Sequence, residues 1–317
     1  MNSALQLKNK KYALELNYEF FQNFESDLTK KSYQIDLLQF FDFIRDNFLD
    51  VIQYDAVKRF HIVAFKNWLT NSNFAPKTIN RKLSAISSFF DFLAEKDLVT
   101  FNPCTSVKRP KQSVIHETND LSDSQIKSLL FELENLKEKS LLHKAIIYLL
   151  FTTGIRKAEL LSLKLKNYKV KDQFKIIEIK AKGGKFLTKI LHPKCIEVLE
   201  EYLEYLKLNS SEELHPEDWI FRPTKNPLNP THLIKPLNPK SIDYIVKSWC
   251  KKAGIEKKVS PHSARASYIG SALQNGVDIY KVSRDVGHSS VKTTEEYNKR
   301  KMKLNNEAVM GLGFLKE

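Results

Sequence analysis

Two imidazoles, a guanidinium and a phenol lie within one stretch of the chain, residues 261–297. They belong to His262, His288, Arg265 and Tyr297. His262 and Arg265 are three positions apart in a segment whose apolar residues have helical spacing, so both side chains project from one face of a helix. A forked guanidinium can hold the non-bridging oxygens of a phosphodiester, and a hydroxyl can attack its phosphorus. These four residues therefore predict a site for a phosphodiester.

The elements around His288 and Tyr297 give the two residues different settings. The helical pattern breaks at Gly276, a second short helix is predicted from Asp278, and Gly287 ends that helix, which places His288 at a turn. Tyr297 follows in a polar segment without apolar partners at helical spacing, so we expect an exposed phenol. For each histidine taken singly, a structural role is the alternative.

A second arginine, Arg156, follows a buried helix predicted at residues 141–151 (LLHKAIIYLLF), a run too short to span a membrane. Residues 152–154 end that helix, and Arg156 lies in the first turn of the next. Free backbone N–H groups and the helix dipole favour an anion there. The alternative is a surface ion pair between Arg156 and Glu159.

Strands are predicted only in the second half of the chain. Residues 173–180 and 186–191 alternate with period two, and the Lys-Gly-Gly-Lys run at 182–185 forms the hairpin turn between them. Helices are predicted from the Asp120 cluster, at 191–208 and at 241–253, with a turn-rich segment between the last two. A lysine in a hairpin turn is ordinarily a solvated charge.

The first block of the chain is predicted to be entirely helical. Two helices span residues 18–48 with a break at 29–31, a third covers 61–70, and a fourth opens at Pro76 and runs to Leu93. The phenylalanine-rich stripe of these helices is core. The opposite face of the fourth helix is basic and suits phosphates, a solvated face being the alternative. The candidate DNA-binding residues are Lys77, Arg81 and Lys82.

Composition supports a polyanionic partner. The 317 residues carry 51 Lys and Arg against 37 Asp and Glu, a formal net charge of +14, although a lysine-rich coding bias is an alternative source. The three cysteines (Cys104, Cys195 and Cys250) show no disulfide or zinc spacing, which indicates a reducing compartment and no structural metal. No signal peptide or membrane span is evident, so we expect a cytoplasmic protein.

The motifs together resemble the tyrosine recombinases, also called phage-type integrases. HSAR at 262–265, GH at 287–288 and Tyr297 nine positions after the second histidine are similar to the C-terminal signature of that family. TTGIRKAELLSLK at 152–164 resembles the box that carries its first catalytic arginine. One departure is Ala266, which stands where the family often has a histidine.

The resemblance extends to the hairpin. AKGGK at 181–185 is similar to the turn that carries the family's catalytic lysine, which places Lys182 as the general acid that protonates the leaving 5′ oxygen. Ala181 replaces the usual glycine, and Lys185 is a rival for the same role.

The resemblance also implies roles for the other residues. Tyr297 attacks phosphorus and forms a 3′-phosphotyrosyl intermediate, while Arg156 and Arg265 hold the non-bridging oxygens. His262 accepts the tyrosine proton, since a tyrosine hydroxyl has an ordinary pKa of about 10 and needs a base. His288 hydrogen-bonds the phosphate. The reaction requires no metal ion, ATP or other cofactor.

The expected fold is mainly α with a small antiparallel β-sheet. TINRKLSAISSFFDFL at 78–93 resembles the family's core-binding domain. We expect a helical, SAM-like DNA-binding domain, a linker, and an α+β catalytic domain that ends in a tail, the two domains forming a clamp on DNA. Their boundaries are residues 1–110 for the first domain, 111–119 for the linker, 120–317 for the catalytic domain and 302–317 for the tail.

The resemblance implies a site-specific recombinase that binds double-stranded DNA at a specific recombination site. It acts as a homo-tetramer held together through the C-terminal tail, with no membrane partner. Chromosome dimer resolution and mobile-element integration or excision are both open roles, with a septal DNA translocase or accessory factor as a partner by analogy. The rivals are type IB topoisomerase-like relaxation and a catalytically inactive DNA-binding regulator.

Overall fold

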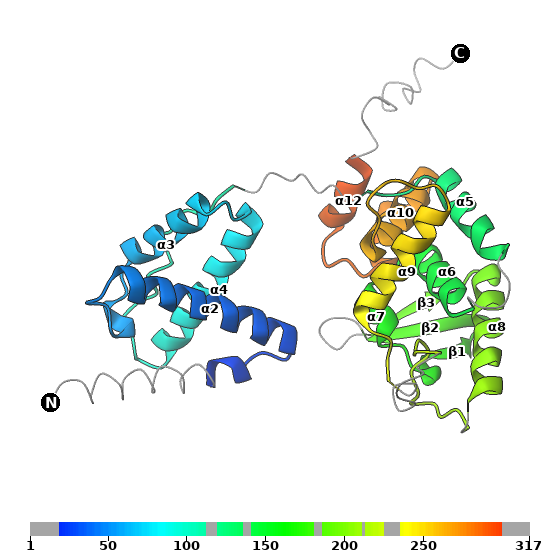
Figure 1. The fold of residues 1–317 in the computed structure, drawn as a ribbon, viewed down its shortest axis with the longest axis horizontal. Helices are drawn as coiled ribbons and strands as arrows, with labels where there is room; N and C mark the ends of the chain where they lie inside the picture. The colour runs from blue at the N-terminus through cyan, green and yellow to red at the C-terminus, as the bar shows by residue number, and fades with distance from the viewer. Residues whose placement is uncertain are drawn as a thin grey trace, which may run out of the picture. The chain divides into compact units, whose positions relative to one another are not determined.

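The computed structural model describes residues 19–111, 119–135, 141–180, 186–210, 213–224 and 235–299. The chain divides into two compact units, residues 1–115 and 116–317 (Figure 1). Both units are mainly helical, and the second contains a small antiparallel sheet, as predicted. Within the described residues, none of the helices combines the length and the apolar character needed to cross a membrane.

Three main helices of the first unit pack around a core rich in phenylalanine, and the prediction that these phenylalanines are core is confirmed. These helices are α2 (Asp27–Asn47), α3 (Arg59–Asn71) and α4 (Pro76–Glu95), with a 3-10 turn, η1 (Tyr54–Ala56), between α2 and α3. The predicted break at residues 29–31 lies earlier in the structure, because Ser26 caps α2 by accepting a hydrogen bond from the backbone N–H of Thr29.

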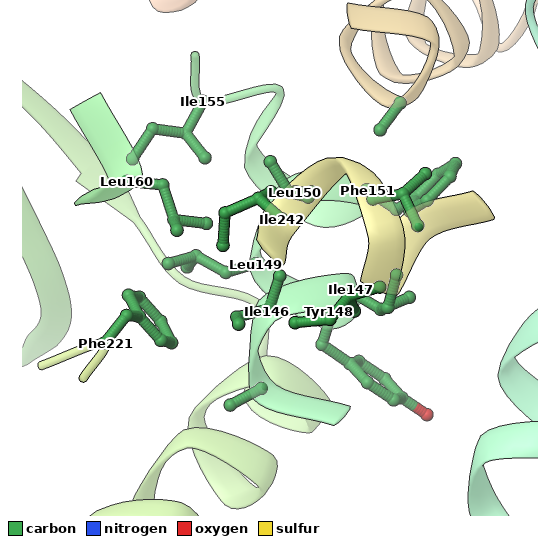
Figure 2. Close-up of a cluster of buried hydrophobic side chains, with 14 of the residues drawn as sticks. Ile146, Ile147, Tyr148, Leu149, Leu150, Phe151, Ile155, Leu160, Phe221 and Ile242 are labelled. Atoms are coloured by element: carbon green, nitrogen blue, oxygen red, sulfur yellow. The ribbon is translucent and has the colours of Figure 1, made fainter. Parts of the chain in front are cut away.

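The second unit is built around α6, whose apolar side chains fill its centre (Figure 2). Helices α8, α9 and α10 pack around α6. The bounds of the elements are α5 (Asp123–Glu134), α6 (Leu141–Thr153), α7 (Lys157–Leu161), η2 (Leu165–Asn167), β1 (Tyr168–Lys171), β2 (Phe174–Lys180), β3 (Phe186–Ile190), α8 (Pro193–Asn209), α9 (Pro239–Lys252), α10 (Pro261–Gln274), α11 (Ile279–Asp285) and α12 (Val291–Lys299).

The sheet has the order β1-β2-β3, and both strand pairs are antiparallel. The predicted antiparallel pairing of the two hairpin strands is confirmed, with Lys180 opposite Phe186 as the last pair, while the turn predicted at 182–185 lies outside the described residues. Strand β1 was not predicted, because its alternation of Tyr168 and Val170 with lysines spans only four residues, which are mostly exposed. Helix α12 was not predicted either, since its sequence is strongly polar.

Candidate active site

Arg265 is the buried centre of the site. It lies on α10 with 2% of its surface exposed. One terminal nitrogen donates to the carbonyl of Gly154 at 2.7 Å, and the other donates to the carbonyl of Val286. Burial, and then the nearby Arg156 guanidinium, lower the pKa of Arg265 to about 10, so it remains charged at neutral pH. The guanidinium therefore ties the end of α6 to the end of α11.

Arg156, at the start of α7, contacts the same turn at the end of α11 that Arg265 contacts. It is the N-cap residue of that helix, and it follows Gly154, whose φ is +59°. Its Nη1 donates to the Glu159 carboxylate at 2.6 Å, and its Nη2 donates to the carbonyl of Gly287 at 3.1 Å. The ion pair weighed from the sequence is present, but 42% of the arginine side chain stays exposed. The two arginines thus bind the carbonyls of two consecutive residues.

The space around position 154 and its backbone conformation explain why this residue is a glycine. A Cβ at this position would lie 2.6 Å from a ring carbon of Tyr268, and the backbone conformation is left-handed. Only glycine fits both conditions without strain. This tight turn allows α6 to end and Arg156 to follow two residues later.

Tyr297 lies beside His262. Its hydroxyl oxygen is 3.4 Å from Nε2 of His262, which is exposed at the start of α10. The prediction of an exposed phenol was wrong, because Tyr297 is only 9% exposed. Its ring joins an apolar cluster on α10 and α11 that comprises Ala266, Ile269, Val282 and Val286. Those partners are distant in the sequence, so the polar sequence around Tyr297 gave no signal of them.

His288 follows the turn that ends α11, as predicted. Gly287 has a φ of +64°, and the backbone N–H of His288 donates to the carbonyl of Ser283 at 3.0 Å. Its Nδ1 is 2.8 Å from Oγ1 of Thr294, and its ring is stacked on that of Tyr297 with centroids 6.1 Å apart. Burial, and then the charges of the neighbouring arginines, lower the pKa of His288 to about 4, so its ring is neutral at pH 7.

The structure thus brings five of the predicted catalytic residues into one unit: Arg156, His262, Arg265, His288 and Tyr297. The sixth, Lys182, lies outside the described residues, as does its rival Lys185. Two guanidinium groups beside a hydroxyl with an imidazole partner can hold and attack a phosphodiester. Among the described residues, no cluster of His, Cys, Asp or Glu is placed to hold a metal ion.

The candidate DNA-binding residues on α4 differ from one another. Lys77 and Arg81 are exposed, although Arg81 is also paired with Asp36. Lys82 is only 4% exposed, and its Nζ donates to the fully buried Asp36 carboxylate at 2.8 Å. A buried carboxylate requires such a partner. The prediction for Lys82 is therefore corrected, because its ammonium group is held inside the first unit.

Sequence reasoning missed Lys189, a buried lysine on β3. Only 2% of its side chain is exposed, and its Nζ donates to the carbonyl of Thr153 at 2.7 Å and to Asp285 Oδ2 at 2.8 Å. The signal was present, since the period-two pattern places Lys189 on the same face of the strand as Leu187. A lysine in an inward register is unusual enough to single out.

Comparison with known proteins gives two family matches. The model of the phage integrase family matches residues 119–303, and that of the phage integrase N-terminal SAM-like domain matches residues 19–97. Tyrosine recombinase XerC of Leptospira interrogans is 29% identical over 286 residues, which cover 89% of this chain and 86% of that protein. Tyrosine recombinase XerD of Listeria innocua is 28% identical over 270 residues, covering 85% of this chain and 86% of the relative.

A solved structure has the same fold. The XerH site-specific recombinase, in a post-cleavage complex with its palindromic difH substrate, superposes with a TM-score of 0.70 at 19% identity. The match covers 89% of this chain and 80% of XerH.

Proposed function

The chain belongs to the phage integrase family of tyrosine recombinases and is a DNA breaking-rejoining enzyme, and from this premise we propose that Tyr297 is the residue that breaks the strand. The observation that carries the proposal is the convergence of Arg156 and Arg265 on the carbonyls of Gly287 and Val286. Directly after that turn comes His288, whose ring is stacked on that of Tyr297. A phosphate held by the guanidinium groups would be within reach of the phenol.

In the first step the Tyr297 oxygen attacks phosphorus, and the bond between phosphorus and the 5′ oxygen breaks. A covalent 3′-phosphotyrosyl bond forms, and the departing strand carries a free 5′-hydroxyl. His262 accepts the phenolic proton, which is supported by the 3.4 Å separation between its Nε2 and the tyrosine oxygen. Lys182 donates the proton that the leaving oxygen requires. The reverse reaction with another 5′-hydroxyl rejoins the strand.

Charge on the pentacoordinate phosphorus is stabilised by Arg156 and Arg265. Both groups are held by backbone carbonyls before DNA arrives, so little reorganisation is needed when the negative charge develops. Neutral His288 donates a hydrogen bond to a phosphate oxygen through its Nε2–H. Its Nδ1 then accepts from the Thr294 hydroxyl, which fixes the tautomer.

The reaction exchanges strands between two copies of one specific DNA site, within a homo-tetramer joined through the tail predicted at residues 302–317, which lies outside the described residues. This finer role is supported by similarity to XerC and XerD over 85 to 89% of the chain. Strand exchange between two sites distinguishes a recombinase from an enzyme that only relaxes supercoils.

Covalent trapping tests the proposal. Short duplexes of randomised sequence, each with one nick, are incubated with the full chain, and adducts that survive SDS are sequenced to find the site. We expect wild-type protein to form adducts and Tyr297→Phe to form none, while both bind the recovered duplex equally. Adducts that persist in Tyr297→Phe would overturn the assignment of the nucleophile.

A plasmid carrying two copies of the recovered site tests strand exchange. Deletion or inversion of the intervening DNA is the expected product. Relaxation of supercoils without exchanged products would favour the topoisomerase-like activity instead.

A further inference from the structure

Lys189 contacts the ends of α6 and α11, the same two places that the arginines contact. Its Nζ contacts the carbonyl of Thr153 and the carboxylate of Asp285, and it lies 5.5 Å from the ring centroid of Tyr268. The Tyr268 hydroxyl donates to the same Asp285 oxygen at 2.8 Å. These contacts join β3, the end of α6, α10 and α11 at one buried ammonium group.

Lys189 and the two arginines bind residues that are adjacent in the sequence. At the end of α6, Lys189 donates a hydrogen bond to the carbonyl of Thr153, and Arg265 donates one to the carbonyl of Gly154. At the end of α11, Lys189 pairs with the carboxylate of Asp285. Arg265 donates to the carbonyl at position 286, and Arg156 donates to the carbonyl at position 287. Three cations therefore share two short backbone segments, 153–154 and 285–287.

An ammonium group at this depth has a physical cost. Burial lowers the pKa of Lys189, while the carboxylate of Asp285 acts in the opposite direction. An apolar side chain would fill the same space without that cost, and a buried ion pair is weak evidence of stabilisation by itself. An apolar side chain could not reproduce the geometry of Lys189, whose ammonium group donates to both segments.

We infer that Lys189 is a positioning residue for the strand-breaking reaction, acting through Arg265 and Arg156. Its ion pair with Asp285 and its bond to Thr153 fix the two segments whose carbonyls orient the guanidinium groups. Without it, these segments shift and the arginines meet the phosphate in a poorer geometry. This inference rests on the proposed function, because it concerns the same phosphate.

The test uses Lys189→Met together with the double variant Lys189→Met/Asp285→Asn. The double variant removes both charges, keeps the volume close and leaves an amide oxygen for the Tyr268 hydroxyl, so it protects the experiment against misfolding. Single-turnover cleavage of the recovered nicked duplex is measured beside thermal unfolding and DNA affinity. Lys175→Met is the control, because Lys175 lies on the same sheet and pairs with Glu200 of α8, but its side chain is 38% exposed.

We expect both Lys189 variants to cleave about 10- to 100-fold more slowly than wild type, with unchanged DNA affinity, because a small misplacement of reacting groups has effects of this size. The control should cleave at the wild-type rate. Equal rates for the double variant and wild type would overturn the inference.

A second substrate separates positioning from a general loss of structure. A methylphosphonate at the scissile position lacks one of the charged oxygens that the arginines bind. The cleavage defect should therefore shrink on this substrate if Lys189 acts through the arginines. An equal defect on both substrates would mean that Lys189 only supports the fold. Failure of wild-type protein to form any adduct would instead contradict the proposed function.

Discussion

The hydroxyl of Tyr297 lies 3.4 Å from Nε2 of His262, although 35 positions separate the two residues in the sequence. Packing of α12 against α10 and α11 produces this relationship, since the tyrosine ring is part of the apolar cluster there. The contacts that anchor α12 therefore also place the proposed nucleophile beside its proposed base.

The first prediction concerns that pair. His262→Gln should lower the rate of covalent adduct formation by about 10²-fold or more, because it removes the proposed acceptor of the phenolic proton. Since His262 is exposed, unfolding free energy should change by no more than about 0.5 kcal/mol. Single-turnover trapping and thermal denaturation measure the two effects. An unaltered cleavage rate would show that another group takes the proton.

Arginine-to-lysine variants should separate the two guanidinium groups. Arg265→Lys and Arg156→Lys should each lower cleavage about 10²- to 10³-fold, because an ammonium group cannot reproduce the fork. Arg265→Lys should also destabilise the protein by about 1 to 3 kcal/mol, since one ammonium cannot bridge the Gly154 and Val286 carbonyls. The Arg156 side chain is 42% exposed, so its variant should lose less stability than Arg265→Lys. Equal stability losses in urea denaturation would contradict this assignment.

Local chemistry was readable from the sequence. Asp278 caps α11 and Gly287 ends it with a positive φ, as predicted, because capping depends on a few neighbouring residues. The break before α2 was misplaced because a Ser26 cap was not considered. The two strands of the hairpin followed from their period-two alternation, and the buried α6 followed from its continuous apolar run.

Contacts between distant segments were not readable. The burial of Tyr297 depends on α10 and α11, and that of Lys82 depends on Asp36, which lies 46 positions away on α2. A helical wheel assigns Lys82 to a basic face only because it does not include the neighbouring helix. Lys189 was missed for the opposite reason, since its inward register was visible but its partners were not.

A third prediction follows from the pKa of His288, which falls to about 4 from an ordinary value of about 6.5. Between these values the unfolded chain binds a proton that the folded protein does not, so stability decreases as the pH falls through this window. His288→Gln removes this contribution. Its melting temperature should therefore fall less than that of wild type between about pH 7 and about pH 5. Identical falls in the two proteins would contradict the lowered pKa.

The last prediction separates Lys82 from Lys77 on α4. Lys82→Met leaves the fully buried Asp36 with Arg81 as its remaining ion-pair partner, so we expect a loss of about 3 kcal/mol in unfolding free energy. Lys77→Met alters an exposed side chain and should change stability by no more than about 0.5 kcal/mol. Urea denaturation of the full chain measures both values.

The effects of the two variants on DNA binding should have the reverse order, with Lys77→Met weakening binding more than Lys82→Met. We propose that Lys77 contacts a phosphate, so Lys77→Met should weaken binding and reduce the slope of log affinity against log salt by about 1. Lys82→Met should leave that slope unchanged, because its ammonium group is bonded to Asp36 inside the first unit. Both slopes are measured by titrating the recovered duplex at several salt concentrations below the unfolding temperature. If Lys82→Met lowers the slope and leaves stability intact, Lys82 contacts DNA and the buried pair with Asp36 is not its role.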